Sequence, residues 1–171
     1  MSLKIWLPLN GTLENKGISN ASITNNGATV STSGKIGSCY SFDGTNDYLS
    51  ISDFNPNAWS EISISFWYKA TTDMSGFFCI RGTSNNAGTI SVVINANGFS
   101  FCDTVTTGTM KTFAFPNGFP LDIWTHVVCI YKKGEVFMYL NGEEQIHDTS
   151  LINSNRKLDV RTSGATIRIG R

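Results

Sequence analysis

Paired carboxylates are the first chemistry to look for in this chain, because two of them placed correctly can hydrolyse a glycosidic bond. A retaining glycosidase needs its two carboxyl groups about 5 Å apart, a spacing that alternate residues on one strand face provide. No two acidic residues stand two positions apart in this sequence. Glu143 and Glu144 are adjacent and would face opposite sides of a strand, while Asp43 and Asp47 belong to a turn. With no G-x-S-x-G nucleophile motif either, the sequence predicts a protein that is not an enzyme.

The richest cluster of oxygen ligands surrounds one turn. Asp43, Asn46 and Asp47 could hold Ca²⁺ there, with Asn10 or Asn15 adding a ligand. The alternative is structural: Asp43 would accept hydrogen bonds from the backbone of its own turn, and Asp47 would order the hairpin. With only two carboxylates, the structural interpretation is favoured. No cofactor is required, and Ca²⁺ is the one ion considered.

Thiols and imidazoles show no metal-binding or disulfide pattern. The four cysteines are widely and irregularly spaced, and the two histidines lie far apart; these residues are Cys39, Cys79, Cys102, Cys129, His126 and His147. Since Cys79 and Cys129 stand inside apolar runs, buried thiols are predicted. His126 is expected to be a core or half-buried histidine whose ring nitrogens are hydrogen-bonded, in preference to a ligand-binding residue.

Aromatic side chains, 12% of the residues, are the candidate sugar contacts. Trp59 and Phe119 lie in loop-like segments, where ligand contacts concentrate. The alternative is that both cap the ends of the fold. Tyr139 lies in a strand pattern and is expected in the core.

Composition excludes other classes of partner. Lys plus Arg and Asp plus Glu are equal at 13 each, so the cationic surplus of a nucleic-acid-binding protein is missing. No apolar run approaches the ~20 residues of a spanning helix, and no signal peptide is recognised at the start. The expectation is a protein made in a bacterial cytoplasm, with no nucleic acid partner and no membrane insertion.

Short strands separated by Asn-Gly and Asp-Gly turns predict an all-β protein. In residues 62–68, Ile62, Ile64, Phe66 and Tyr68 alternate with Ser63, Ser65 and Trp67. Residues 124–131 and 136–140 form a predicted hairpin, and Asn141-Gly142 turns the chain into 143–147. Further strands are predicted at 3–9, 28–31, 39–42, 48–51, 77–81, 89–95, 99–104, 109–115 and 167–170.

Six segments in order resemble a known family. They are Leu7-Pro-Leu-Asn-Gly-Thr-Leu-Glu-Asn15, Tyr40-Ser-Phe-Asp-Gly-Thr-Asn-Asp-Tyr-Leu49, Ile62-Ser-Ile-Ser-Phe-Trp-Tyr-Lys69, Trp124-Thr-His-Val-Val128 with Tyr131, Val136-Phe-Met-Tyr-Leu-Asn-Gly142 and Ile167-Arg-Ile-Gly170. Together they are similar to the laminin-G-like jelly roll of the concanavalin A-like lectin and glucanase superfamily. The resemblance spans nearly the whole chain, which predicts one domain over residues 1–171 built as a two-sheet antiparallel jelly-roll sandwich. It also implies that Trp67 packs between the sheets.

The same resemblance implies a function and a setting. The opening residues are similar to laminin-G-like proteins of bacteriophages, so we expect a binding or adhesion module on the surface of a phage virion, recognising a glycan or host-surface glycoprotein. The alternatives are a structural decoration domain that binds other virion proteins, and a degenerate glycoside hydrolase. The family's final strand, of the D-D-[VI]-R-[IV]-Y type, has no counterpart before Arg171. Its loss would expose a sheet edge and predicts self-association.

Overall fold

The computed structural model describes residues 2–56, 58–71, 78–81, 90–93, 98–101, 111–116, 118–151, 155–158 and 166–170. Within these ranges all regular structure is β, and no helix is long and apolar enough to cross a membrane. Thirteen strands are assigned there: β1 (Ser22–Asn26), β2 (Thr29–Ser31), β3 (Cys39–Ser41), β4 (Tyr48–Ser52), β5 (Glu61–Tyr68), β6 (Phe78–Arg81), β7 (Ile90–Val93), β8 (Gly98–Phe101), β9 (Lys111–Ala114), β10 (Thr125–Lys132), β11 (Glu135–Leu140), β12 (Glu143–Asp148) and β13 (Thr166–Ile169).

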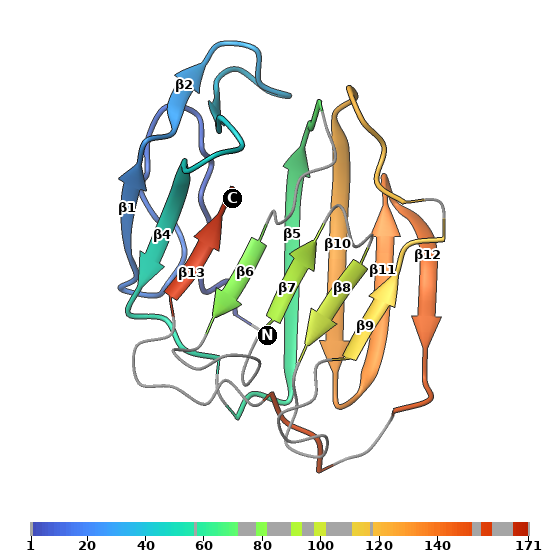
Figure 1. The fold of residues 1–171 in the computed structure, drawn as a ribbon. Helices are drawn as coiled ribbons and strands as arrows, with labels where there is room; N and C mark the ends of the chain where they lie inside the picture. Colours follow the sequence, from blue (N-terminus) through green and yellow to red (C-terminus); the bar gives the residue numbers. More distant parts are fainter. Residues whose placement is uncertain are drawn as a thin grey trace.

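Two antiparallel sheets lie face to face (Figure 1). The larger sheet has the order β1-β4-β13-β6-β7-β8-β9, and the smaller one has the order β12-β11-β10-β5. The hairpin of β2 and β3 forms a separate two-stranded sheet at one end of the molecule. This arrangement confirms the predicted all-β sandwich of antiparallel sheets.

Strict alternation explains why the four-stranded sheet forms. Along β10, Thr125, Val127, Cys129 and Tyr131 are buried while the residues between them are partly exposed. β11 alternates in the same way, and its register with β10 places the two buried sets on one face. Two-residue turns join β10 to β11 and β11 to β12, which confirms the predicted hairpins.

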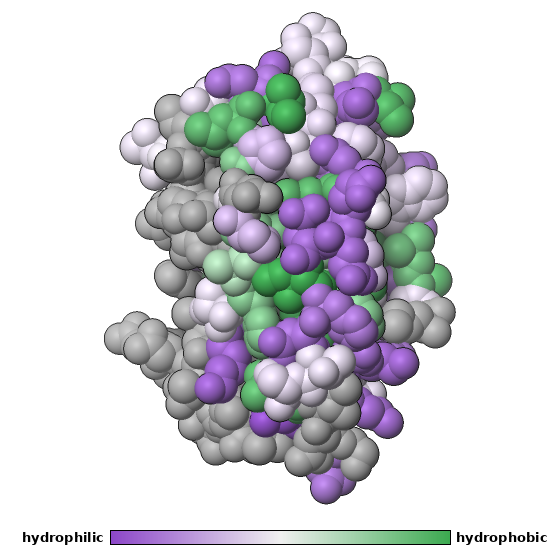
Figure 2. Space-filling model, turned by 90° about the vertical axis from the view of Figure 1, so that its right-hand side faces the viewer, coloured by the Kyte–Doolittle hydropathy of each residue, from purple (hydrophilic) through white to green (hydrophobic). Residues whose placement is uncertain are grey.

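One hydrophobic core fills the space between the sheets. Ile51, Ile80 and Ile167 come from the larger sheet, and Val127 and Met138 come from the smaller one; all five are at most 1% exposed. Burying a side chain of this size contributes about 1.5–3 kcal/mol. Figure 2, which turns the right-hand side of Figure 1 toward the viewer, shows hydrophobic groups at the centre between hydrophilic ones, and further hydrophobic groups near the top and at the right.

One strand prediction is wrong, and one strand was not predicted. The predicted strand positions 77, 89, 94–95, 102–104 and 109–110 lie outside the described residues. Residues 3–9 are not a strand: they lie beside residues 16–19 through three backbone hydrogen bonds, and Ile5 and Leu7 pack against the core. Pro8 cannot donate to a ladder, which disfavours a regular strand there. β1 was not predicted, because Ile23 is its only apolar residue.

Candidate functional site

Polar residues on three neighbouring strands share the outer face of the seven-stranded sheet. On β4, Leu49 and Ile51 are buried, so Ser50 between them points outward. The strand register aligns Ser50 with Thr24 on one side and with Arg168 on the other. The same row continues from Arg168 through positions 79, 91, 100 and 112, so that it spans all seven strands. The side chains of Thr24, Ser50 and Arg168 present polar groups where a ligand could lie across β1, β4 and β13.

Tyr48 and Arg168 form the most defined contact on this face. The guanidinium carbon of Arg168 lies 4.7 Å from the centre of the Tyr48 ring, a cation–π contact that orients the guanidinium group. Nearby, the Asn26 side-chain amide donates to the Ser50 hydroxyl at 3.2 Å. The face therefore combines an aromatic ring, five-donor Arg chemistry, an amide and hydroxyl groups.

The turn that was considered for calcium is held by its own hydrogen bonds. One carboxylate oxygen of Asp43 accepts from the backbone N–H groups of Thr45, Asn46 and Asp47, at 2.8, 3.1 and 3.2 Å. Asp47 in turn accepts from the Asp43 backbone N–H at 3.1 Å. The hydrogen bonds from the backbone of Thr45 and Asn46 hold the pKa of the Asp43 carboxyl below its ordinary value. These contacts are the structural role that the sequence favoured for Asp43 and Asp47.

No group of three or more His, Cys, Asp or Glu side chains suited to a metal occurs among the described residues. Binding of Ca²⁺ by Asp43, Asn46 and Asp47 stays a prediction. Calorimetric titration of chelator-treated protein with Ca²⁺ tests it, and the absence of binding heat would contradict it.

Trp59 and Phe119, the sugar contacts proposed from sequence, both pack inward. Phe119 is 7% exposed, and its ring meets Tyr68 and Phe115 edge-on at centroid distances of 5.7 and 4.5 Å. Trp59 is partly buried against the core and meets Phe54 edge-on at 5.4 Å. Their ligand role stays a prediction, and their packing makes more exposed aromatic rings better placed for a ligand.

Trp67 and Tyr139 lie on the outer face of the four-stranded sheet, so placing them in the core was wrong. Trp67 is 43% exposed. Its side chain lies on the same face of β5 as Ser63 and Ser65, and on the opposite face from the buried Ile64 and Tyr68. The alternation of β5 therefore assigned the Trp67 side chain correctly, whereas the family resemblance did not.

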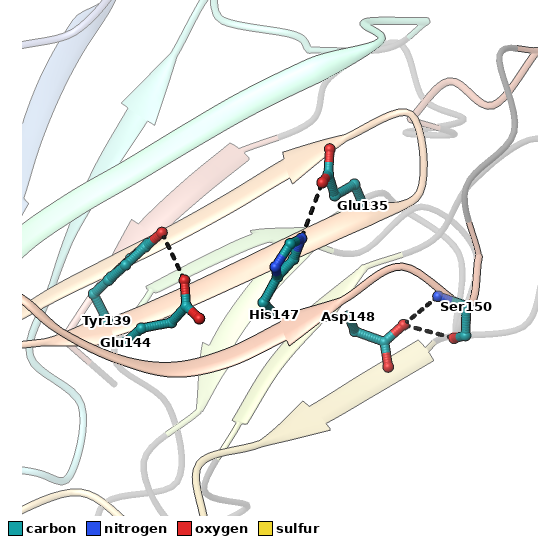
Figure 3. A network of polar contacts seen from close by, with 6 residues as sticks. All are labelled: Glu135, Tyr139, Glu144, His147, Asp148 and Ser150. Carbon is teal, nitrogen blue, oxygen red and sulfur yellow. Dashed lines mark hydrogen bonds and ion pairs between the residues drawn. The ribbon is translucent and has the colours of Figure 1, made fainter.

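Polar contacts link β11 and β12 on this same outer face (Figure 3). The Tyr139 hydroxyl donates to Glu144 at 3.3 Å, and His147 contacts Glu135 at 3.0 Å while stacking on Phe137. The two carboxylates are those of Glu135 and of Glu144, which pairs with Tyr139. Positions 135 and 139 are four steps apart on β11, or about 13 Å along the strand. The two carboxylates thus belong to register positions farther apart than the roughly 5–9.5 Å that glycosidases use.

The described cysteines carry reduced thiols, and the His126 imidazole is hydrogen-bonded. Cys39, Cys79 and Cys129 are not joined in disulfides, and Cys129 is fully buried, as predicted; Cys102 lies outside the described residues. Cys79 is partly exposed rather than buried, because Ile80 takes the inward position on β6. His126 is half-buried, with Nε2 2.8 Å from the Ser65 hydroxyl, which confirms the expected hydrogen-bonded histidine.

A family model described as the Concanavalin A-like lectin/glucanases superfamily matches residues 43–171. The chain belongs to this superfamily. A search of curated proteins finds no match to it.

One solved structure superposes well on this chain, and a second is similar to a lesser degree. Domain 4 of AbnA, an extracellular arabinanase of Geobacillus stearothermophilus solved with arabinotriose, superposes with a TM-score of 0.66 at 18% identity, covering 99% of this chain and 94% of that one. The carbohydrate binding module CBM66 of Bacillus subtilis gives a TM-score of 0.41 at 12% identity, covering 86% of this chain and 87% of that one. At 18% identity, the likeness to the arabinanase domain shows the fold alone.

Sequence reasoning missed the polar row of this concanavalin A-like domain. Arg168 was noticed only as part of the Ile167-Arg-Ile-Gly170 motif, and Ser50 only as part of a strand. The available signal was Arg168 between two isoleucines, since an Arg in such an alternating strand must face outward. Its neighbours across the sheet could not be read from the sequence.

Proposed function

We propose that this chain is a non-catalytic carbohydrate-binding module, and that the outer face of the seven-stranded sheet binds the glycan. The row that runs from Thr24 through Ser50 and Arg168 across the sheet carries this proposal, together with the Tyr48 ring beside it. Sugars present many hydroxyl groups around an apolar ring face, and both features find partners here. The spacing of the carboxylates on the opposite face supports binding without hydrolysis.

Each residue of the site has a distinct role in this proposal. Arg168 donates to sugar oxygens, because its guanidinium offers five N–H donors and is already oriented by Tyr48. Ser50 and Thr24 donate to or accept from neighbouring sugar hydroxyls. Asn26, which donates to Ser50, fixes the direction of that hydroxyl. Membership of a superfamily that includes lectins, and the likeness to an arabinanase domain solved with arabinotriose, add support.

Glycan-array screening followed by calorimetry tests the proposal, with neutral oligosaccharides including arabinotriose among the probes. Arg168→Met and Ser50→Ala are expected to weaken binding of the best glycan about tenfold. For Arg168 this is the effect of losing a hydrogen bond from a charged donor. Lys132→Met and Ser63→Ala are the matched controls, since both lie on the opposite sheet. Equal losses in the controls, or no glycan bound, would overturn the proposal.

A second candidate function is assembly with other proteins. The paired segment at the start of the chain exposes Leu3, Trp6 and Ile18 by 59%, 52% and 68%, and the Ile18 backbone N–H donates to the Leu3 carbonyl at 3.0 Å. Several exposed apolar side chains on one segment favour a protein contact. If assembly is the function, Trp6→Ser abolishes co-purification with virion proteins. If instead the wild-type protein binds a glycan and the Trp6→Ser variant binds it equally well, the first proposal is supported.

The proposed setting is the surface of a phage virion, reached by a protein made in a bacterial cytoplasm and released with the particle. It rests on the resemblance of the opening residues to phage proteins. Mass spectrometry of purified virions and the identity of the neighbouring genes test it. Absence of the protein from particles, with no tail or capsid gene nearby, would contradict this setting.

A further inference from the structure

An exposed tryptophan stands on the sheet face opposite to the proposed glycan site. Trp67 lies near the end of β5, and 43% of its surface is exposed. The other residues on this face of β5 include the small, polar Ser63 and Ser65. Large aromatic side chains usually bury most of their surface. A Trp that the core does not use is therefore available for a ligand.

The indole is held in a defined orientation before any ligand arrives. His126, its direct cross-strand partner on β10, stacks on it with a centroid distance of 5.0 Å and an interplanar angle of 26°. His126 Nε2 lies 2.8 Å from the Ser65 hydroxyl, and the His126 backbone N–H donates to the Asn141 side chain at 2.9 Å. A binding surface whose side chains are already fixed loses little conformational entropy when a ligand binds.

A cation reaches the same indole from a different sheet. Lys35 lies in the turn between β2 and β3, and its ammonium nitrogen is 4.8 Å from the centre of the Trp67 ring. The turn is tight: the Gly34 backbone N–H donates to the Gly37 carbonyl at 2.9 Å, and a Cβ on Gly34 would lie 2.6 Å from that oxygen. The fold of the hairpin thus determines where Lys35 lies.

The Lys35 ammonium contacts the Trp67 ring. Carboxylates also stand at this end of the sheet: Glu144 lies in the same cross-strand row as Ser65, three strands away, and the Asp122 backbone N–H donates to the Ala70 carbonyl at 2.8 Å. The exposed Lys69 follows Trp67 by two positions in the sequence. The nearest carboxylate on β5 is that of Glu61, six residues away, or about 20 Å along the strand. Glu135 lies in that same distant row, since Lys132 pairs with both Glu61 and Glu135. A negatively charged ligand on Trp67 would therefore meet the Lys35 ammonium.

We propose that Trp67, Lys35 and His126 form a second binding site, specific for an acidic sugar unit such as a uronic acid. The carboxylate of the sugar pairs with the Lys35 ammonium, and the apolar C–H face of the sugar ring lies against the exposed part of the indole. Ser65 and His126 lie beside the indole for contacts to sugar hydroxyls. The site is independent of the polar row, which lies on the other sheet.

Titration with oligogalacturonate, followed by calorimetry and by tryptophan fluorescence, tests this site. Lys35→Met is expected to weaken binding about tenfold or more, as loss of a charge-assisted contact does. Wild-type affinity should fall as NaCl is raised from 50 to roughly 500 mM, because salt screens an exposed ion pair. A neutral galacto-oligosaccharide of the same length should bind this site at least about tenfold more weakly.

Matched variants separate this proposal from the first. Trp67→Phe should abolish the fluorescence change, whereas Trp6→Phe, which alters another exposed tryptophan, should not. Lys132→Met is the charge control on the same sheet face. Arg168→Met should leave oligogalacturonate binding unchanged even if neutral glycans no longer bind. Equal binding of acidic and neutral oligosaccharides, unchanged affinity in Lys35→Met, or no binding of oligogalacturonate would overturn the proposal.

Discussion

Burial determines what each thiol of this protein can do. Cys129 is fully enclosed between Val127 and Tyr131 on the inner face of β10, and desolvation raises its pKa to about 12. A buried thiolate has lost its hydration without gaining a partner, so the neutral thiol is strongly favoured. Cys39 is partly exposed. The two residues therefore differ in reactivity although their chemistry is the same.

Alkylation is expected to distinguish them. At pH 8 iodoacetamide should modify Cys39 in the native protein and leave Cys129 unmodified, because the thiolate is the reacting species. The raised pKa also predicts that the free energy of unfolding falls as pH rises from about 9 to 12, since only the unfolded chain releases the Cys129 proton in that range. Mass spectrometry after digestion, with a urea-unfolded sample as control, measures the modification. Rapid native labelling of Cys129 would contradict the assignment.

Two hairpins of the same type build the smaller sheet. Lys133 and Gly134 have φ values of 49° and 90°, and Asn141 and Gly142 have 50° and 88°. Two consecutive residues with positive φ are what a type I′ turn requires, and this turn matches the twist of the strands. The hairpins differ in their surroundings, because a Cβ at Gly134 would collide with the Leu151 carbonyl, whereas one at Gly142 would meet nothing within 4 Å.

Alanine substitution at the two glycines should therefore have unequal effects. Gly142→Ala adds only the backbone strain of positive φ, about 1–2 kcal/mol. Gly134→Ala adds the same strain and also displaces the Leu151 backbone, so its loss of unfolding free energy should be larger. Urea denaturation of both variants beside wild type measures the difference. Equal losses would mean that the contact with residue 151 does not constrain this turn.

Elements with clear alternation could be predicted from the sequence, and those without it could not. β5, β10 and β11 were all found, because buried and outward residues alternate along them. β1 has the sequence Ser-Ile-Thr-Asn-Asn, which is typical of a turn. It is a strand here because β4 supplies five consecutive pairing partners, and that tertiary contact has no local signal.

The candidate sites could be predicted less well than the strands. Each depends on residues that only the complete molecule brings together, such as Thr24, Ser50 and Arg168 in one row and Lys35 beside Trp67. Loop position alone favoured Phe119, yet its ring fits between Tyr68 and Phe115 in the core. The face of a strand on which a side chain lies follows from local alternation and can be predicted from the sequence. The register between strands that are distant in sequence cannot.

The edge strands of the two sheets determine where another copy of the molecule could add a strand. β1 and β9 end the larger sheet, and β5 and β12 end the smaller one. Charged side chains on an edge strand oppose pairing with another chain. β12, β5 and β9 all carry such residues, whereas β1 carries none.

Self-association through β1 is accordingly expected at high protein concentration. Thr24→Lys should reduce it, because a charge on the edge strand disfavours addition of a further strand. Thr112→Lys on the opposite edge, which already carries Lys111, is the matched control. Sedimentation velocity over a range of concentrations measures the association. A wild-type protein that stays monomeric throughout would contradict the expectation.

The position of β13 has a consequence for how the chain acquires its structure. β13 is the last of the thirteen strands in the sequence, yet it lies between β4 and β6 in the larger sheet. Until it is synthesised, the pair β1–β4 and the group β6–β9 have no strand to join them. Contacts between residues so distant in sequence form slowly, and two unpaired edges are exposed to aggregation meanwhile. The larger sheet can therefore close only after β13, residues Thr166–Ile169, has left the ribosome.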